Sequence, residues 1–423
     1  GRVEDRDEMS TRPRRRLLAV LACLTVVLFP QPASSTYAGW AARSGEAGSG
    51  PQTWRTYGPS APDGVHWDDV NREHWARAAV DHVAGANDWM RDYRQLEDGA
   101  YPFRPDDLET RRLFARALYR AFGSDIEVDP AVTFNDLTDT DRFFRFANVT
   151  VAQGWIEAVD GNFLPAEPVT AGLAHRALVL AIGLGDLAAG ADALHMRDGT
   201  TIPTPSGFGT LLIGMRLGLR YNHGDESLDV GPDDPLSRAE VAWSLYRATT
   251  APSWVRDALA GYATIELPSL SERMQQVVAW GVRYVGHPYL WGGDWAEPTP
   301  SGYCCGWQPR GGFDCSGMTW WLMKKASAGW DNSPPREYMG WDLPERSSAA
   351  MASVGTRIRW RDIRPGDLLF YDGDDDGTVD HVDTYIGNGW AIDSGSSNAG
   401  VTITYVLDNW YEDHFVRGRR LTR

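Results

Sequence analysis

A cysteine that could act as a nucleophile lies in residues 311–317, whose sequence is GGFDCSG, and an apolar run follows it. The glycines before it and the helix formers after it predict that Cys315 stands at the N-terminus of a helix. Unpaired backbone N–H groups and the helix dipole favour a thiolate there, and the thiolate is the reactive form of cysteine. The stretch therefore indicates thiol chemistry at Cys315, with a buried, inert cysteine as the alternative.

Three more short motifs accompany this stretch, one before it and two after it. They are PYLWGG at residues 288–293, RPGDLLF at 364–370 and HVDTYIGNG at 381–389. In this order, and together with FDCSG, they resemble the motifs of NlpC-type cell-wall endopeptidases, which are papain-like cysteine peptidases that cut peptidoglycan stem peptides. The resemblance implies a papain-like α+β domain over residues 268–423.

The same resemblance implies roles for individual residues. Cys315 is the expected nucleophile, and His381, on an apolar strand after a polar loop, is the expected base. Asp393 falls where the family has the residue that orients the base, commonly a histidine; a carboxylate can accept from the imidazole N–H and stabilise the imidazolium. Tyr289 matches the family tyrosine whose hydroxyl lies near the oxyanion, beside the backbone N–H of Cys315.

The elements that must position these residues begin near residue 268. Ser269 and Glu272 have the spacing of a capping box, and apolar residues recur at helical spacing after them. This pattern predicts a helix over residues 274–285 that opens the catalytic domain. An insertion over residues 294–312 precedes the nucleophile and is expected to border the cleft, with a plain surface loop as the alternative. It carries Cys304, Cys305, Trp295 and Trp307.

An acidic loop precedes the expected base. In residues 372–383, aspartates stand at the first, third, fifth, ninth and twelfth positions and a glycine at the sixth, which is the spacing of an EF-hand calcium loop. The chemistry itself needs no cofactor, and the hypothesis is a structural calcium that orders the strand bearing His381. A solvated acidic hairpin tip is the alternative. The candidate ligands are Asp372, Asp374, Asp376, Thr378, Asp380 and Asp383. Asp383 replaces a glycine of the family and is expected on the same strand face as His381.

The chain before residue 251 contains an internal repeat. The turns FRP (103–105) and FLP (163–165) recur. Helices open at TRRL (110–113), TAGL (170–173) and SRAE (237–240), each with its first Thr or Ser as the expected cap. This order resembles three S-layer homology repeats, which bind secondary cell-wall polymers, and implies a mainly α-helical wall-binding region. Arg111 and Arg238 are the candidate polymer ligands, because arginine at a helix N-terminus offers a fork for carboxylate or phosphate. The second copy lacks this arginine, and a helical spacer is the alternative.

Composition and the first residues point to export. The net charge of −16 and the pI near 5.0 argue against nucleic acid as the main partner. Residues 9–38 read as a secretory signal whose apolar core is too short to span a bilayer comfortably; a lipoprotein box at Cys23 and an uncleaved anchor are the alternatives. The acidic residues 1–8 suit no targeting signal, which favours Met9 as the start. If Cys23 leaves with the signal, three of the four cysteines remain and at least one thiol is free.

These expectations combine into one organisation. A leader and signal (1–38), a flexible linker (39–65), three repeats (66–250) and a connector (251–267) precede the peptidase domain (268–423). We expect a secreted, wall-associated peptidoglycan hydrolase with no transmembrane span in the mature chain. Its partners are stem peptides and a secondary wall polymer, and the expected cut is the D-isoglutamyl–diamino acid bond, through a thioester. An inactive wall-binding protein, or an amidase or acyltransferase on the same scaffold, is the alternative.

Overall fold

The computed structural model describes residues 65–295, 299–302, 306–308, 311–323, 341 and 343–422. The expected leader and signal, the linker up to residue 64, and the cysteines Cys23, Cys304 and Cys305 lie outside these residues. Among the described helices, none combines the length and the apolar character that crossing a bilayer requires.

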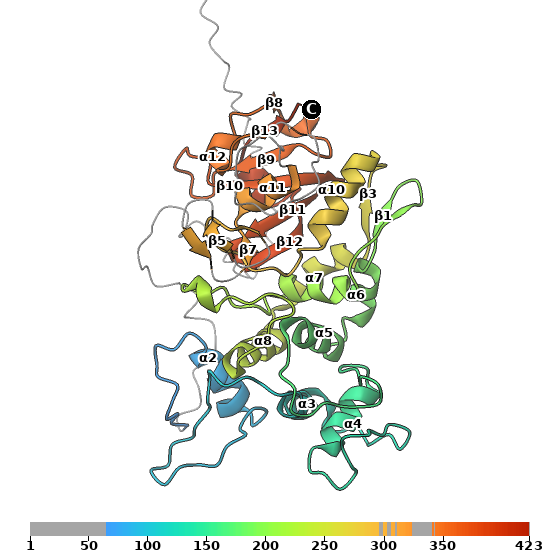
Figure 1. Ribbon diagram of the computed structural model, residues 1–423, viewed down its shortest axis with the longest axis vertical. Helices are drawn as coiled ribbons and strands as arrows, with labels where there is room; N and C mark the ends of the chain where they lie inside the picture. The colour runs from blue at the N-terminus through green and yellow to red at the C-terminus, as the bar shows by residue number, and fades with distance from the viewer. Residues whose placement is uncertain are drawn as a thin grey trace, which may run out of the picture. The chain divides into compact units, whose positions relative to one another are not determined.

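The region from residue 77 to residue 263 is mainly helical and runs from blue to yellow in Figure 1. Its α-helices are α2 (Arg77–Val80), α3 (Arg111–Leu118), α4 (Phe144–Ala152), α5 (Ala171–Ala181), α6 (Gly185–Ala191), α7 (Phe208–Arg216), α8 (Arg238–Thr250) and α9 (Ser253–Leu259). π-Helical turns η2 (Asp81–Ala86) and η3 (Tyr119–Gly123) continue α2 and α3. Two 3₁₀ turns, η4 (Glu226–Leu228) and η5 (Ala260–Ala263), and two short strands, β1 (Leu194–Met196) and β2 (Thr201–Ile202), complete the region.

The two F-x-P turns have the same local structure. The Asp69 carboxylate accepts hydrogen bonds from the backbone N–H groups of Phe103 and Arg104, at 2.9 and 2.6 Å. Asp136 does the same for residues 163–164, at 2.8 Å each. The middle residue of each turn has a positive φ, 60° in the first and 59° in the second. Two copies of the predicted internal repeat therefore fold alike at this point.

The segments that precede α3, α5 and α8 close into a ring. Isolated bridges pair Leu108 with Ser237, Thr110 with Pro168, and Thr170 with Pro235. The side chains of Thr170 and Ser237 cap their helices, as predicted. The Thr110 side chain makes no cap hydrogen bond, so the cap predicted for the first copy is wrong. This geometry supports an internal repeat, while its assignment to S-layer homology repeats stays a prediction.

The expected connector is structured. It forms α9, η5 and strand β3 (Ile265–Leu267), which pairs in parallel with β1. The Tyr262 hydroxyl donates to the Ile403 carbonyl, 3.2 Å away. One hydrophobic core runs through both the helical region and the C-terminal region, and the described residues belong to one compact unit. A fragment cut at residue 268 would therefore expose packed side chains.

The C-terminal region is built on a six-stranded antiparallel sheet in the order β12-β11-β10-β9-β13-β8 (Figure 1). The strands are β8 (Thr356–Ile358), β9 (Leu368–Tyr371), β10 (His381–Gly387), β11 (Trp390–Gly395), β12 (Gly400–Tyr405) and β13 (Phe415–Arg420). The helices are α10 (Glu272–Val282), α11 (Cys315–Met323), α12 (Ser348–Met351) and α13 (Trp410–Asp413), with 3₁₀ turns η6 (Trp360–Asp362) and η7 (Ser396–Asn398). Helices and sheet together confirm the predicted α+β class of this region.

Two local expectations are refined here. The N-cap of α10 is Ser271, whose hydroxyl accepts from the Met274 N–H, and not the predicted Ser269. The insertion holds four short strands, β4 (Asp294–Trp295), β5 (Thr299–Gly302), β6 (Gly306–Gln308) and β7 (Gly312–Phe313). Strands β4 and β7 pair. The ring centroid of Trp295 lies 4.4 Å from that of Trp321 in α11. This end of the insertion is thus attached to the nucleophile helix.

Candidate active site

Helix α11 begins at Cys315, which confirms the predicted place of the cysteine at a helix N-terminus. The preceding residue, Asp314, caps this end of the helix. Its Oδ1 accepts from the Gly317 N–H and from the Ser316 hydroxyl, and its Oδ2 accepts from the Gly292 N–H, 2.9 Å away. One carboxylate thus satisfies helix-end donors and ties the nucleophile to the WGG turn.

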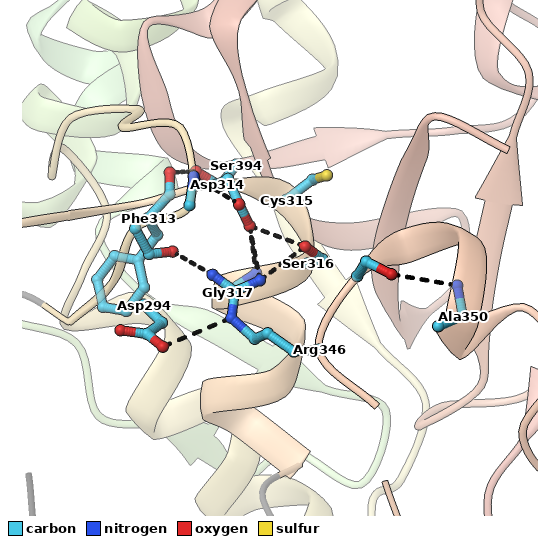
Figure 2. A network of polar contacts seen from close by, with 12 residues as sticks. Asp294, Phe313, Asp314, Cys315, Ser316, Gly317, Arg346, Ala350 and Ser394 are labelled. Atoms are coloured by element: carbon cyan, nitrogen blue, oxygen red, sulfur yellow. Dashed lines mark hydrogen bonds and ion pairs between the residues drawn. The ribbon is translucent and has the colours of Figure 1, made fainter. Parts of the chain in front are cut away.

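A buried arginine binds the capping carboxylate and the residues around it. Arg346 is 1 % exposed and donates to the Gly293 carbonyl (2.8 Å), Asp314 (3.1 Å) and the Ser316 hydroxyl (2.7 Å), with Asp294 at 3.5 Å (Figure 2). Burial alone would lower the pKa of Arg346, but the two carboxylates outweigh it and raise the pKa. Sequence reasoning assigned Arg346 no role, because it lies in no motif and reaches the site only through the fold.

The glycine of FDCSG is required by this close packing. A Cβ on Gly317 would lie 1.9 Å from the Gly293 carbonyl oxygen and 2.5 Å from Nη2 of Arg346. Any other residue would therefore push the helix away from the arginine. Figure 2 shows the sulfur of Cys315 directed away from this polar network.

His381 is the first residue of β10, and it meets Cys315 at the start of the strand. The imidazole lies close enough to the thiol to lower its pKa, and Sγ lies 3.9 Å from the carbonyl oxygen of Asp380. Burial raises the pKa of the Cys315 thiol and outweighs the opposing effect of His381. Burial thus opposes the thiolate that the helix terminus is expected to favour, whereas His381 favours it.

Two carboxylates flank the base. Nε2 of His381 lies 3.0 Å from Oδ1 of Asp393 and 3.1 Å from Oδ1 of Asp383. Burial alone would lower the pKa of His381, but these two carboxylates raise it well above its ordinary value. Because Nε2 contacts the carboxylates, Nδ1 is the ring nitrogen available to the thiol. The structure thus places Asp393 against His381 and the start of β10 beside Cys315, while the catalytic roles of the three residues stay a prediction.

The two carboxylates have different surroundings. Oδ2 of Asp393 accepts from Nδ2 of Asn398 (2.7 Å) and from the Tyr411 hydroxyl (3.1 Å). Burial raises the pKa of Asp393, but His381 and these donors outweigh it, and the net shift is downward. Burial and the neighbouring Asp393 raise the pKa of Asp383 to about 7. Sequence reasoning missed Asn398 and Tyr411, since neither belongs to a motif.

Tyr289 lies beside the nucleophile segment. Its backbone forms a parallel bridge with Phe313, two residues before Cys315, and its N–H donates to the Ala399 carbonyl at 3.4 Å. The residue is buried. Its backbone therefore lies next to the segment that carries Cys315. The role of its hydroxyl at the oxyanion stays a prediction.

Part of the acidic loop gathers its carboxylates. Ligand atoms of Asp372, Asp374 and Asp376 lie within 4.8 Å of one another. These carboxylates also accept backbone N–H groups of their own loop, for example from Gly377 to Asp372 at 2.8 Å and from Thr378 to Asp376 at 2.7 Å. Calcium binding by the three aspartates stays a prediction.

Two other candidate ligands, Asp380 and Asp383, do not join this group of carboxylates. Asp380 turns back to accept the Gly373 N–H at 3.0 and 3.1 Å. Asp383 lies in strand β10 beside His381, where it groups with His381 and Asp393 and not with the loop. Its assignment as the twelfth calcium ligand is corrected on this ground: strand pairing continues through residue 383, so its side chain points into the buried sheet face.

The two candidate polymer-binding arginines are buried. Arg111 donates from Nε to the Phe163 carbonyl and from Nη2 to the Glu157 carbonyl, both at 2.7 Å. Arg238, 0 % exposed, donates to the Phe103 carbonyl and to Glu109, at 2.8 and 2.7 Å. In this arrangement both guanidinium groups hold the F-x-P turns of the repeats. Polymer binding through them stays a prediction.

Comparison with known proteins agrees with this geometry. Residues 286–420 match the NlpC/P60 family. The chain is 28% identical over 142 residues to the murein DD-endopeptidase MepH of Escherichia coli K12, covering 33% of this chain and 43% of MepH. It is 28% identical over 148 residues to the bifunctional muramidase/DL-endopeptidase CwlT of Bacillus subtilis 168, covering 35% and 36%. The chain thus spans less than half the length of these curated relatives.

A solved structure also aligns with this region. RipD from Mycobacterium tuberculosis, described as a non-catalytic NlpC/p60 domain protein adapted to peptidoglycan binding, is 25% identical with a TM-score of 0.24. The alignment covers 36% of this chain and 98% of RipD.

Proposed function

Because residues 286–420 form an NlpC/P60 domain, we propose that the chain is a peptidoglycan endopeptidase with Cys315 as its nucleophile. The observation that carries the proposal is that Sγ of Cys315 lies 3.9 Å from the carbonyl oxygen of Asp380, the residue before His381, and that Nε2 of His381 lies 3.0 Å from Asp393. Nucleophile, base and orienting carboxylate are what hydrolysis through a thiol requires.

The proposed reaction proceeds in two halves. His381 takes the Cys315 proton, and the thiolate attacks the carbonyl carbon of the scissile peptide bond. The resulting oxyanion is stabilised by the Cys315 N–H at the start of α11 and by the Tyr289 hydroxyl. The imidazolium then protonates the leaving amine, and a thioester remains. His381 next removes a proton from water, which attacks the thioester, releases the carboxylic acid and restores the thiol.

The bond that is cut is proposed to be the D-isoglutamyl–diamino acid bond of the stem peptide. The names of the relatives refer to different bonds, since MepH is a DD-endopeptidase and CwlT a DL-endopeptidase. Digestion of purified peptidoglycan by the full chain, read by mass spectrometry, tests the proposal. We expect muropeptides cut within the stem, and none from Cys315→Ala.

Other outcomes of this digestion would favour the alternatives. Whole stem peptides freed from the sugar would indicate an amidase. A folded wild-type chain that binds walls but yields no product would indicate a wall-binding protein whose peptidase domain does not turn over. Melting curves of the wild type and Cys315→Ala establish that both are folded.

The helical region is proposed to hold the secreted enzyme at the wall through a secondary polymer. The repeated turns and the ring before α3, α5 and α8 support a repeat architecture. In the inactive Cys315→Ala background, Arg111→Ala should reduce co-sedimentation with purified walls severalfold. Arg197→Ala, which removes the same charge from an exposed site, is the control. Equal retention of both variants, with unchanged melting temperatures, would contradict a ligand role for Arg111.

A calcium ion is proposed at Asp372, Asp374 and Asp376. The convergence of these three side chains supports it, because hard cations prefer several oxygen ligands. Titration calorimetry of the full chain with calcium should show binding at millimolar concentrations or below, and Asp374→Asn should abolish it. Absence of heat in the wild type would leave the loop as a solvated hairpin tip.

A further inference from the structure

A second buried carboxylate touches the catalytic base, and none of the steps above requires it. Strand alternation puts His381 and Asp383 on the same face of β10. The opposite face of the strand meets α11, where the hydroxyls of Thr384 and Thr319 lie 3.4 Å apart. Asp383 is 0 % exposed, and its Oδ1 lies 3.1 Å from Nε2 of His381.

Hydrogen-bond accounting shows that the two carboxylates cannot be equivalent. Nε2 of His381 offers one proton to the two carboxylates. Asp393 already receives donors from Asn398 and Tyr411 as well as from His381, so it is equipped to stay ionised. Asp383 contacts the same Nε2, and a carboxylate oxygen of Asp383 lies within 4.8 Å of one of Asp393. Two carboxyls this close to each other favour a state in which one of them holds a proton.

The net charge of the cluster also favours one neutral carboxyl. Two ionised carboxylates beside one imidazolium would leave an uncompensated negative charge in a buried site, which is costly. The described groups that face Asp383 are His381 on its own strand, Asp393 on β11 and the Tyr371 phenol on β9; Tyr411 of α13 lies behind Asp393. Neither phenol carries a positive charge, and the described groups around the pair include no second cation.

We propose that Asp383 is a positioning residue: as a neutral carboxyl it donates its proton to Asp393 and braces the His381 imidazole so that Nδ1 faces Cys315. One carboxylate then matches one imidazolium, and the ring is held by two side chains from neighbouring strands instead of one. The inference rests on the proposed peptidase function, because it deepens the role of the same base.

The test compares Asp383→Asn with Asp383→Ala in the full chain. An asparagine amide is neutral and can donate to Asp393, whereas alanine can neither donate nor brace the ring. We expect Asp383→Asn to keep kcat within about threefold of the wild type, and Asp383→Ala to lower kcat by about 10- to 100-fold with little change in KM. Asp367→Asn removes another buried carboxylate of the same sheet, one that pairs with Arg420, and is expected to leave kcat unchanged.

A second readout does not depend on the substrate. The rate of Cys315 alkylation by iodoacetamide, followed on the Cys315 peptide by mass spectrometry, should fall in the same order, with wild type and Asp383→Asn similar and Asp383→Ala slower. If the wild type cuts no peptidoglycan, the proposed function fails, and the alkylation order alone decides the role of Asp383. If Asp383→Asn lowers kcat and the alkylation rate as much as Asp383→Ala does, the neutral-carboxyl assignment is overturned. If Asp383→Ala equals the wild type in both kcat and alkylation rate, the positioning role is overturned.

Discussion

At the scale of single residues, the site depends on how burial changes ordinary side-chain chemistry. Burial raises the pKa of the Cys315 thiol, so its helix position does not by itself produce a thiolate. Two carboxylates raise the pKa of His381 and keep it ready to hold the proton that the thiol gives up. The proposed nucleophile and the proposed base are therefore matched as a pair, and neither is activated alone.

The raised pKa of Asp383 predicts a dependence of stability on pH. Its pKa is raised from 3.8 to about 7, so between these values the folded chain holds a proton that the unfolded chain has released. The stability that Asp383 contributes therefore falls as pH rises through this window. Asparagine has no such proton. The melting temperature of Asp383→Asn minus that of the wild type should therefore rise between about pH 5 and about pH 8.

The control for this pH comparison is Asp139→Asn, which replaces an exposed aspartate of the helical region. Its melting temperature relative to the wild type should stay constant over the same pH range. A constant difference for Asp383→Asn as well would show that Asp383 is already ionised throughout the range.

At the scale of elements, α11 is held in position by the carboxylate that caps its N-terminus and by a buried arginine that binds this carboxylate. Asp314 ties the first turn of the helix to the WGG turn, and Arg346 binds both that carboxylate and the Gly293 carbonyl. The strand β10 then brings His381 to the N-terminal end of the same helix. In the sequence, α11 and β10 are separated by β9 and the acidic loop. Arg346 belongs to none of the motifs.

Loss of Arg346 should destabilise the chain and displace the nucleophile. Arg346→Met leaves Asp314 and Asp294 buried without their cation, which costs about 3–5 kcal/mol in the free energy of unfolding. Arg359→Met removes an arginine of a largely exposed pair with Asp362 and should cost less than about 1 kcal/mol. Urea denaturation of the two variants measures the difference. Equal losses would mean that the Arg346 network adds nothing beyond an ordinary surface ion pair.

At the scale of the whole molecule, the described helical region is more than an attached binding module. Its strand β1 pairs with β3 just before the C-terminal region, and one core continues through both. Arg216 of α7 donates to Oδ1 of Asn398 at 2.9 Å, and Nδ2 of Asn398 donates to Asp393 at 2.7 Å. A chain of hydrogen bonds thus runs from the helical region to the carboxylate that orients the base.

This connection predicts an effect of a remote residue on catalysis. Arg216→Ala removes the group that orients the Asn398 amide, so Asp393 should lose part of its support and kcat should fall about tenfold with KM nearly unchanged. Arg197→Ala, at an exposed site of the same region, is the matched control. Steady-state kinetics on soluble muropeptides would reveal the effect, and an unchanged kcat for Arg216→Ala would show that Asn398 is held without it.

The sequence by itself determined the class of the C-terminal region, the helix that starts at Cys315, and the repeated F-x-P turns. These follow from local patterns, since caps, alternation and ordered motifs act over a few residues. Only the tertiary structure decided that Asp383 joins the base and not the acidic loop, that Arg346 supports the nucleophile, and that burial raises the pKa of the thiol. Each of these depends on desolvation or on contacts between distant segments, which spacing along the chain does not encode.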